Sequence, residues 1–180
     1  MRIEPKDTCC VVVDYQEKFM PVIAEQEMLL QNSTKLLEGL RILEIPLLVT
    51  AQYAKGLGLN VVKIREAAGT EEFFDKKSFS AYGDEKVRDA LRGLGRKSVI
   101  VCGIEAHICV LRTVIDLAAA GYQPILVEDC ISARRLHDKE IAVARARAEG
   151  AIVTTCESLL FELTVSAEHG KFKQISNLVK

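Results

Sequence analysis

The feature that most constrains the fold lies at residues 99–121, where a short buried strand, a tight turn and an apolar helix follow one another. Residues 98–102 are mostly β-branched and apolar, which is typical of a strand. After Gly103 the apolar residues recur at helical spacing. They continue up to Gly121, which suits the left-handed position that ends a helix. This stretch therefore predicts a strand that leads directly into a helix.

The same alternation of strands and helices continues along nearly the whole chain. Strands are predicted at 9–13, 46–50, 98–102, 124–127 and 151–154, with a strand or extended segment within 71–81. Helices are predicted at 27–43, 84–94, 139–149, 158–163 and 172–178, and another ends at Gly121. One or two helical turns are predicted within 60–67, and a loop at 52–58. This order predicts a doubly wound, Rossmann-like three-layer α/β fold. We expect a mostly parallel six-stranded sheet with helices on both faces, in a single domain over residues 1–180.

Composition narrows the class of protein. Hydrophobic residues make up 49% of the 180 residues, which is enough for a sizeable core, and no apolar run approaches the roughly 18 residues of a membrane span. The N-terminus lacks a signal-peptide pattern, so we expect a cytoplasmic protein. The net charge of −1 excludes the basic footprint of a nucleic-acid-binding protein. Exposed apolar residues in the C-terminal third would favour a homo-oligomer: Leu159, Leu160, Phe161 and Leu163.

The cysteines and histidines do not form a metal-binding pattern. The chain has six cysteines but no C-x-x-C pair, and its three histidines are too far apart for H-x3–5-H spacing. A disulfide framework is not expected in an intracellular chain of this size. No glycine-rich phosphate-binding motif is present either. We therefore expect no metal, no cofactor and a small-molecule substrate.

Chemistry in a parallel sheet is expected at the carboxyl ends of its strands. Asp14, the segment 50–53, Cys109 and Cys130 lie at such ends in the predicted fold. Cys109 lies in the first turns of a helix, whose N-terminus should favour the thiolate and lower its pKa. Asp14 is a better proton acceptor for this thiol than His107, because residues two apart on a helix do not face each other.

A lysine could complete this site, and two candidates stand side by side. Lys76 and Lys77 lie in a segment predicted to be extended, where adjacent side chains point to opposite faces. At most one of them can enter a cleft. Composition and spacing leave the choice between them open.

Together these residues resemble the isochorismatase-like cysteine hydrolases. The resemblance rests on D-x-Q at 14–16, K-x-x-F-S-A at 76–81 and G-I-E-A-H-I-C-V at 103–110, and it spans almost the whole chain. The branch of isochorismatase domain-containing proteins is most similar, because G-I-E-A-x-x-C and the loop at 52–58 recur there.

The resemblance implies a catalytic triad of Asp14, Lys76 and Cys109, and it selects Lys76 over Lys77. It implies an oxyanion hole made by the backbone N–H groups of Glu105 and Cys109, and a cis peptide between Ile104 and Glu105. The implied reaction is hydrolysis of a small amide-like C–N bond through a thioester. We expect the substrate-binding side chains to be Gln16, Phe19, Gln52, Tyr53, Ile104, Glu105 and His107.

One departure from the family supports the absence of a metal. The nicotinamidase branch binds a metal through an aspartate and two histidines after the second strand, whereas residues 51–53 here are Ala-Gln-Tyr. An alternative function is a non-catalytic small-molecule-binding or scaffold protein with a vestigial site. All three triad residues are present, which favours the enzyme.

Overall fold

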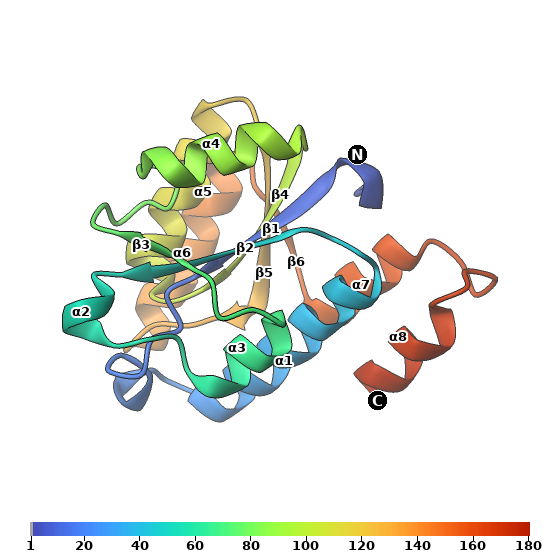
Figure 1. Ribbon diagram of the computed structural model, residues 1–180, viewed down its shortest axis with the longest axis horizontal. Helices are drawn as coiled ribbons and strands as arrows, with labels where there is room; N and C mark the ends of the chain where they lie inside the picture. Colours follow the sequence, from blue (N-terminus) through green and yellow to red (C-terminus); the bar gives the residue numbers. More distant parts are fainter. Residues whose placement is uncertain (1) are drawn as a thin grey trace.

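The computed structural model describes residues 2–180, which form a six-stranded parallel sheet between two layers of helices (Figure 1). The strand order is β3-β2-β1-β4-β5-β6, and every pair of neighbours is parallel. The strands are β1 (Thr8–Val13), β2 (Leu47–Gln52), β3 (Phe74–Lys76), β4 (Ser98–Gly103), β5 (Gln123–Ile131) and β6 (Ile152–Thr154). The predicted doubly wound α/β fold is confirmed.

Helices cover both faces of the sheet. The helices are α1 (Gln26–Ile42), α2 (Ala54–Leu57), α3 (Val62–Ala68), α4 (Glu85–Leu94), α5 (Leu111–Ala119), α6 (Leu136–Ala148), α7 (Cys156–Thr164) and α8 (Phe172–Val179). Two short 3-10 turns, η1 (Pro5–Asp7) and η2 (Met20–Val22), and a π-helical turn, η3 (Ala106–Val110), complete the described elements. Helices α1, α3, α7 and α8 contribute to the hydrophobic core on one face, and α4, α5 and α6 to the core on the other (Figure 1).

The central strand β1 shows why the apolar runs lack alternation. Cys10 and Val12 belong to the core under α1, whereas Cys9, Val11 and Val13 belong to the core under α4 and α5. All five side chains are fully buried, because both faces of the sheet are covered. A strand buried on both faces needs apolar residues at every position, which is the pattern found in the sequence.

Three segments differ from the predicted elements. The predicted loop at 52–58 contains the short helix α2, and the extended segment at 71–81 forms only the three-residue strand β3. Strand β5 continues past the predicted end at 127, with a register shift that pairs Ile131 with Gly103. Cys130 therefore lies inside the sheet and is fully buried. The prediction that it lies at an open strand end is wrong.

The C-terminal leucines do not support a subunit contact. Leu159, Leu160 and Leu163 are fully buried in the core shared with α1, and only Phe161 is exposed, by 37%. The expectation that all four are exposed is wrong, because α7 turns its apolar face toward the sheet. The homo-oligomer and the cytoplasmic location stay predictions. Among residues 2–180, no helix is both long and apolar enough to cross a membrane.

Gly103, at the end of β4, leaves no room for a side chain. Its φ is 134°, and a Cβ atom there would lie 2.1 Å from the backbone oxygen of Val13. That oxygen accepts a hydrogen bond from the Ile104 N–H at 3.0 Å. The close approach therefore holds together β1 and β4 at the point where both strands end.

We expect Gly103→Ala to lower the free energy of unfolding by about 2–5 kcal/mol, the sum of backbone strain and overpacking. Gly93→Ala is the matched control, because Gly93 lies within α4 and a Cβ atom there would meet nothing within 4 Å. It should stabilise the protein by up to about 1 kcal/mol. Guanidinium chloride unfolding measures both, and equal effects would contradict the close approach at Gly103.

Candidate active site

The predicted catalytic residues meet at the centre of the sheet, at the carboxyl ends of β1 and β4. From β1 the sheet extends through β2 to β3 on one side, and from β4 through β5 to β6 on the other. Doubly wound sheets bind their ligands where the strand order reverses in this way. Asp14 follows β1, Lys76 ends β3, and Cys109 lies in the π-helical turn after β4.

Asp14 is a buried carboxylate in a constrained backbone position. It is 1% exposed and has a positive φ of 52°. One carboxylate oxygen accepts a hydrogen bond from the Thr50 hydroxyl at 2.7 Å, and the other accepts one from the Lys76 ammonium at 2.6 Å. Burial raises the pKa of the Asp14 carboxyl above its ordinary value, and the Lys76 ammonium opposes this rise. The carboxylate thus has one cationic partner and one neutral donor.

Lys76 is the lysine that enters the site. Its side chain is completely buried, whereas Lys77 is exposed. Besides Asp14, the Lys76 ammonium donates to the Gln52 side-chain oxygen at 2.8 Å and to the backbone oxygens of Ser78 at 3.1 Å and Phe79 at 3.0 Å. The choice between Lys76 and Lys77, which the extended pattern left open, is therefore Lys76. Its contacts hold the ammonium beside Asp14.

Cys109 lies close to Asp14, and it is buried, with 7% of its surface exposed. The pKa of the Cys109 thiol is raised to about 12, because burial and, to a smaller extent, the Asp14 carboxylate raise it and the Lys76 ammonium opposes them only in part. The prediction that the helix N-terminus lowers the pKa of this thiol is therefore wrong. Loss of water around the sulfur and a neighbouring negative charge outweigh the partial charge of a helix end.

A cis peptide bond joins Ile104 and Glu105, immediately after β4. The Ala106 N–H donates to the backbone oxygen of Ser132 at 2.8 Å, which attaches the turn to the end of β5. Within residues 2–180, the Glu105 N–H donates to no other protein group. This donor is therefore free to bind a ligand oxygen.

The two glutamines predicted to bind substrate support the site from within the protein. Gln16 is fully buried, and its amide nitrogen donates to the backbone oxygens of Gln52 at 3.0 Å and Gly58 at 2.7 Å. Its amide oxygen accepts from the Gln52 N–H at 2.7 Å. The Gln52 side chain in turn bonds Lys76 and the backbone oxygen of Lys77. Both amides thus hold the loop after β2, and Tyr53, 49% exposed, lies at the surface of that loop.

The other predicted substrate-binding residues are spread around the π-helical turn and the first loop. Phe19 is half-buried and packs against the hydrophobic core, and Ile104 is fully buried. His107 is half-buried, and within residues 2–180 its Nδ1 atom is buried without a hydrogen-bond partner.

Glu105 carries a contact that the sequence did not reveal. Its carboxylate is 8% exposed and accepts from both the backbone N–H and the side-chain Nε of Arg134, at 3.2 and 3.0 Å. Thr50 also contacts the site in a way that the sequence does not show, because its hydroxyl donates to Asp14. Its position at a predicted strand end is the one sequence feature that connects Thr50 with the site, and nothing in the sequence connects Arg134 with it.

No metal centre accompanies these residues in the part of the chain that the structure describes. Within residues 2–180, no group of three or more His, Cys, Asp or Glu side chains is arranged to hold a metal ion. The six cysteines are all free and buried. The site is thus built from a buried ion pair, a thiol and backbone donors.

Comparison with known proteins gives one consistent family. The Isochorismatase domain profile matches residues 8–158. Isochorismatase domain-containing protein 1 of Salmo salar is 39% identical over 172 residues, which cover 96% of this chain and 59% of the relative. Isochorismatase domain-containing protein 2 of Danio rerio is 37% identical over 179 residues, which cover 99% of this chain and 89% of the relative.

A solved structure supports the same fold. The MAR1 ribonuclease of Caenorhabditis elegans has a TM-score of 0.93 and 37% sequence identity, covering 99% of this chain and 92% of the other. The chain spans about 59% of the length of the Salmo salar relative, so the two proteins differ in extent.

Proposed function

Since this chain belongs to the isochorismatase family, we propose that it is a cysteine hydrolase that cleaves a small amide-like C–N bond through a thioester. The observation that supports this function is the fully buried Asp14–Lys76 ion pair beside Cys109. A buried pair of charges is costly unless it has a role or a complete set of partners. Here it adjoins a thiol and a free backbone donor at the usual ligand position of the fold.

The first half of the proposed reaction forms the thioester. The high pKa of the Cys109 thiol keeps it protonated at neutral pH, so the proton must leave as the sulfur attacks. Asp14 accepts this proton while the sulfur bonds to the carbonyl carbon. The Glu105 and Cys109 N–H groups bind the developing oxyanion. Asp14 then returns the proton to the nitrogen as the C–N bond breaks, and ammonia or an amine leaves.

The second half hydrolyses the thioester. Asp14, again ionised, accepts a proton from water while the water oxygen attacks the acyl carbon. The C–S bond breaks, the sulfur recovers the proton, and the acid product leaves. Lys76 bonds the Asp14 carboxylate and is itself held in place by its bonds to Gln52, Ser78 and Phe79.

A screen of small primary amides tests this function, with ammonia release as the readout. We expect the wild type to release ammonia and Cys109→Ala to lose at least 10³-fold in kcat, because the nucleophile is gone. Cys9→Ala is the matched control, since Cys9 is a buried cysteine in β1. Equal ammonia release by the wild type and Cys109→Ala would end the proposal.

The same screen separates two other functions. A wild type that binds the compounds without turnover would favour a vestigial binding site. An RNA substrate belongs in the screen as well, because the Caenorhabditis elegans relative is called a ribonuclease. The net charge of −1 favours the small-molecule substrate over RNA.

A further inference from the structure

The Glu105 side chain connects the candidate active site with the segment after β5. One of its carboxylate oxygens accepts two hydrogen bonds from Arg134, from the backbone N–H at 3.2 Å and from the side-chain Nε at 3.0 Å. The Glu105 side chain is only 8% exposed, whereas that of Arg134 is 58% exposed. Within residues 2–180, Glu105 forms a salt bridge with no other cation. A buried carboxylate thus depends on one arginine at the surface.

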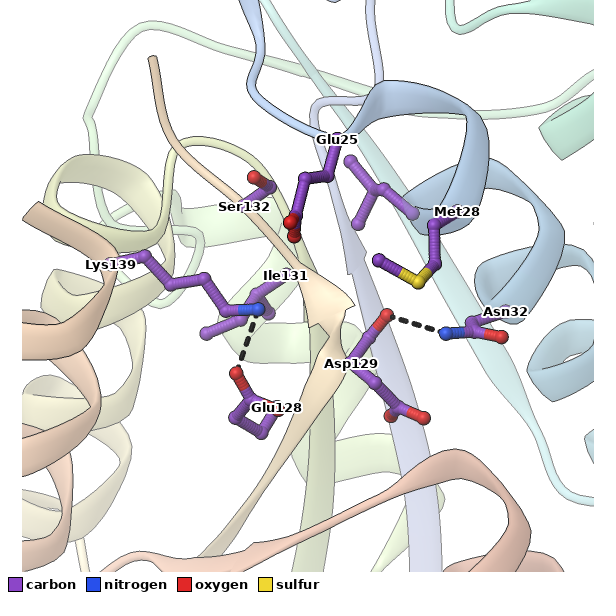
Figure 2. A pocket seen from close by; sticks show the side chains of 9 residues that line it. Glu25, Met28, Asn32, Glu128, Asp129, Ile131, Ser132 and Lys139 are labelled. Atoms are coloured by element: carbon purple, nitrogen blue, oxygen red, sulfur yellow. Dashed lines mark hydrogen bonds and ion pairs between the residues drawn. The ribbon is translucent and has the colours of Figure 1, made fainter. Parts of the chain in front are cut away.

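Backbone bonds hold the segment that carries Arg134. Ser132 lies just beyond the end of β5 and lines the cavity there (Figure 2). Its hydroxyl donates to the Ala24 backbone oxygen at 2.8 Å, and the Ala24 N–H donates to the Ala133 backbone oxygen at 3.0 Å. The Ser132 backbone oxygen accepts from the Ala106 N–H at 2.8 Å. Arg134 is therefore fixed beside the turn by groups other than its own side chain.

The charge of Glu105 affects two parts of the site. Its carboxylate belongs to the same residue as the free N–H that is proposed to bind the oxyanion. A negative charge so close to this donor opposes the negative charge that develops on the substrate oxygen. The same carboxylate also raises the pKa of the Cys109 thiol. Without a cation, Glu105 would weaken both the oxyanion donor and the nucleophile.

Arg134 is the cation in position to offset this charge. Three charged side chains act on the Cys109 thiol, namely Asp14 after β1, Lys76 at the end of β3 and Glu105 before the π-helical turn. Lys76 is already bonded to Asp14. We propose that Arg134 is a positioning residue that acts through Glu105, because it offsets the Glu105 carboxylate beside the oxyanion donor and the thiol. Its effect on turnover rests on the proposed hydrolase function.

Alkylation of Cys109 by iodoacetamide, mapped by mass spectrometry, tests the charge effect without any substrate. The pH is 8.5, where an unpaired Glu105 stays ionised. We expect Arg134→Gln to slow alkylation about threefold, which is the net effect of one unit of thiol pKa on thiolate content and nucleophilicity. Glu105→Gln should make it faster by a similar factor, and Arg134→Lys, which keeps the charge, should retain most of the wild-type rate. Opposite effects of the two glutamine variants cannot arise from a general loss of stability.

The double variant shows whether Arg134 acts through Glu105. Once Glu105→Gln has removed the carboxylate, adding Arg134→Gln should change the alkylation rate by less than about 1.5-fold. Arg135→Gln is the matched control, because Arg135 is the exposed neighbouring arginine and forms no salt bridge within residues 2–180. A threefold loss that persists in the double variant, or equal effects of Arg134→Gln and Arg135→Gln, would overturn the proposal.

Steady-state kinetics with the best amide of the screen test the effect on turnover. Arg134→Gln should lower kcat about tenfold and leave KM within about twofold, because the unpaired Glu105 charge opposes the oxyanion and not the bound substrate. A raised KM with unchanged kcat would assign Arg134 to substrate binding and overturn the proposal. A screen without any active amide would contradict the proposed function, whereas the alkylation rates would still decide whether Arg134 offsets Glu105.

Discussion

Replacing Lys76 with methionine is expected to lower the free energy of unfolding by about 3–5 kcal/mol at pH 7.5. Methionine has a similar length, so the packing volume is largely kept. The Asp14 carboxylate, however, would stay buried without its cationic partner and with neutral donors such as the Thr50 hydroxyl. An unpaired buried charge costs several kcal/mol. Guanidinium chloride unfolding measures the change.

Two further variants separate the charge from the packing. Lys77→Met removes an exposed ammonium and should change the unfolding free energy by less than about 0.5 kcal/mol. Adding Asp14→Asn to Lys76→Met removes the unpaired charge and should restore part of the lost stability. A double variant no more stable than Lys76→Met would show that the loss arises from packing and not from the carboxylate.

The loss should depend on pH in a defined direction. Burial already raises the pKa of Asp14 in the folded protein, and removal of the opposing Lys76 ammonium raises it further. The folded state then binds more protons than the unfolded state between the ordinary pKa of 3.8 and the raised value. Stability is therefore lost as pH rises through the folded pKa, so the variant should approach the wild type as the pH is lowered from 7.5 toward 5.

The sheet could be predicted because a strand that is buried on both faces has an apolar residue at nearly every position. The run 9–13 has no polar residue, and the same property marks most of β4. Boundaries were less predictable where tertiary contacts decide them. Strand β5 runs on to Ile131 because a register shift lets that residue pair with Gly103. Such a pairing, 28 residues apart, has no local sequence pattern.

The candidate site could be predicted only because three motifs follow one another along the chain in the order found in a known family. Spacing could place Asp14 and Cys109 at strand ends, but the choice of Lys76 required the family resemblance. Its contacts to Asp14 and Gln52 cross 62 and 24 residues. The bond between Arg134 and Glu105 crosses 29 residues and was missed for the same reason. The thiol pKa was mispredicted because a helix end is visible in a sequence, whereas the desolvation of a sulfur is not.

Asp14→Asn is expected to make the Cys109 thiol more reactive while abolishing hydrolysis. The Asp14 carboxylate raises the pKa of this thiol, and Lys76 lowers it. Asparagine removes the first effect and leaves the second, so the pKa should fall from about 12 toward the ordinary 9.0. Each unit of fall gives about tenfold more thiolate but about threefold lower nucleophilicity, for a net gain of about threefold.

The measurement is the rate of iodoacetamide alkylation at pH 7.5, mapped to Cys109 by mass spectrometry, beside ammonia release from the best amide of the screen. We expect alkylation about 3- to 10-fold faster and kcat at least 10²-fold lower. Asp89→Asn alters an exposed aspartate on α4 that pairs with Arg92, and it should change neither. Slower alkylation would contradict the electrostatic role of Asp14.

The two readouts together distinguish a proton acceptor from a group that only ionises the sulfur. If hydrolysis required only a thiolate, the variant with more thiolate would be the faster enzyme. Asparagine cannot accept the thiol proton or return it to the leaving nitrogen. A more reactive thiol that no longer turns over would therefore assign the proton transfers to Asp14, and it would explain why a buried carboxylate lies beside a thiol whose pKa it raises.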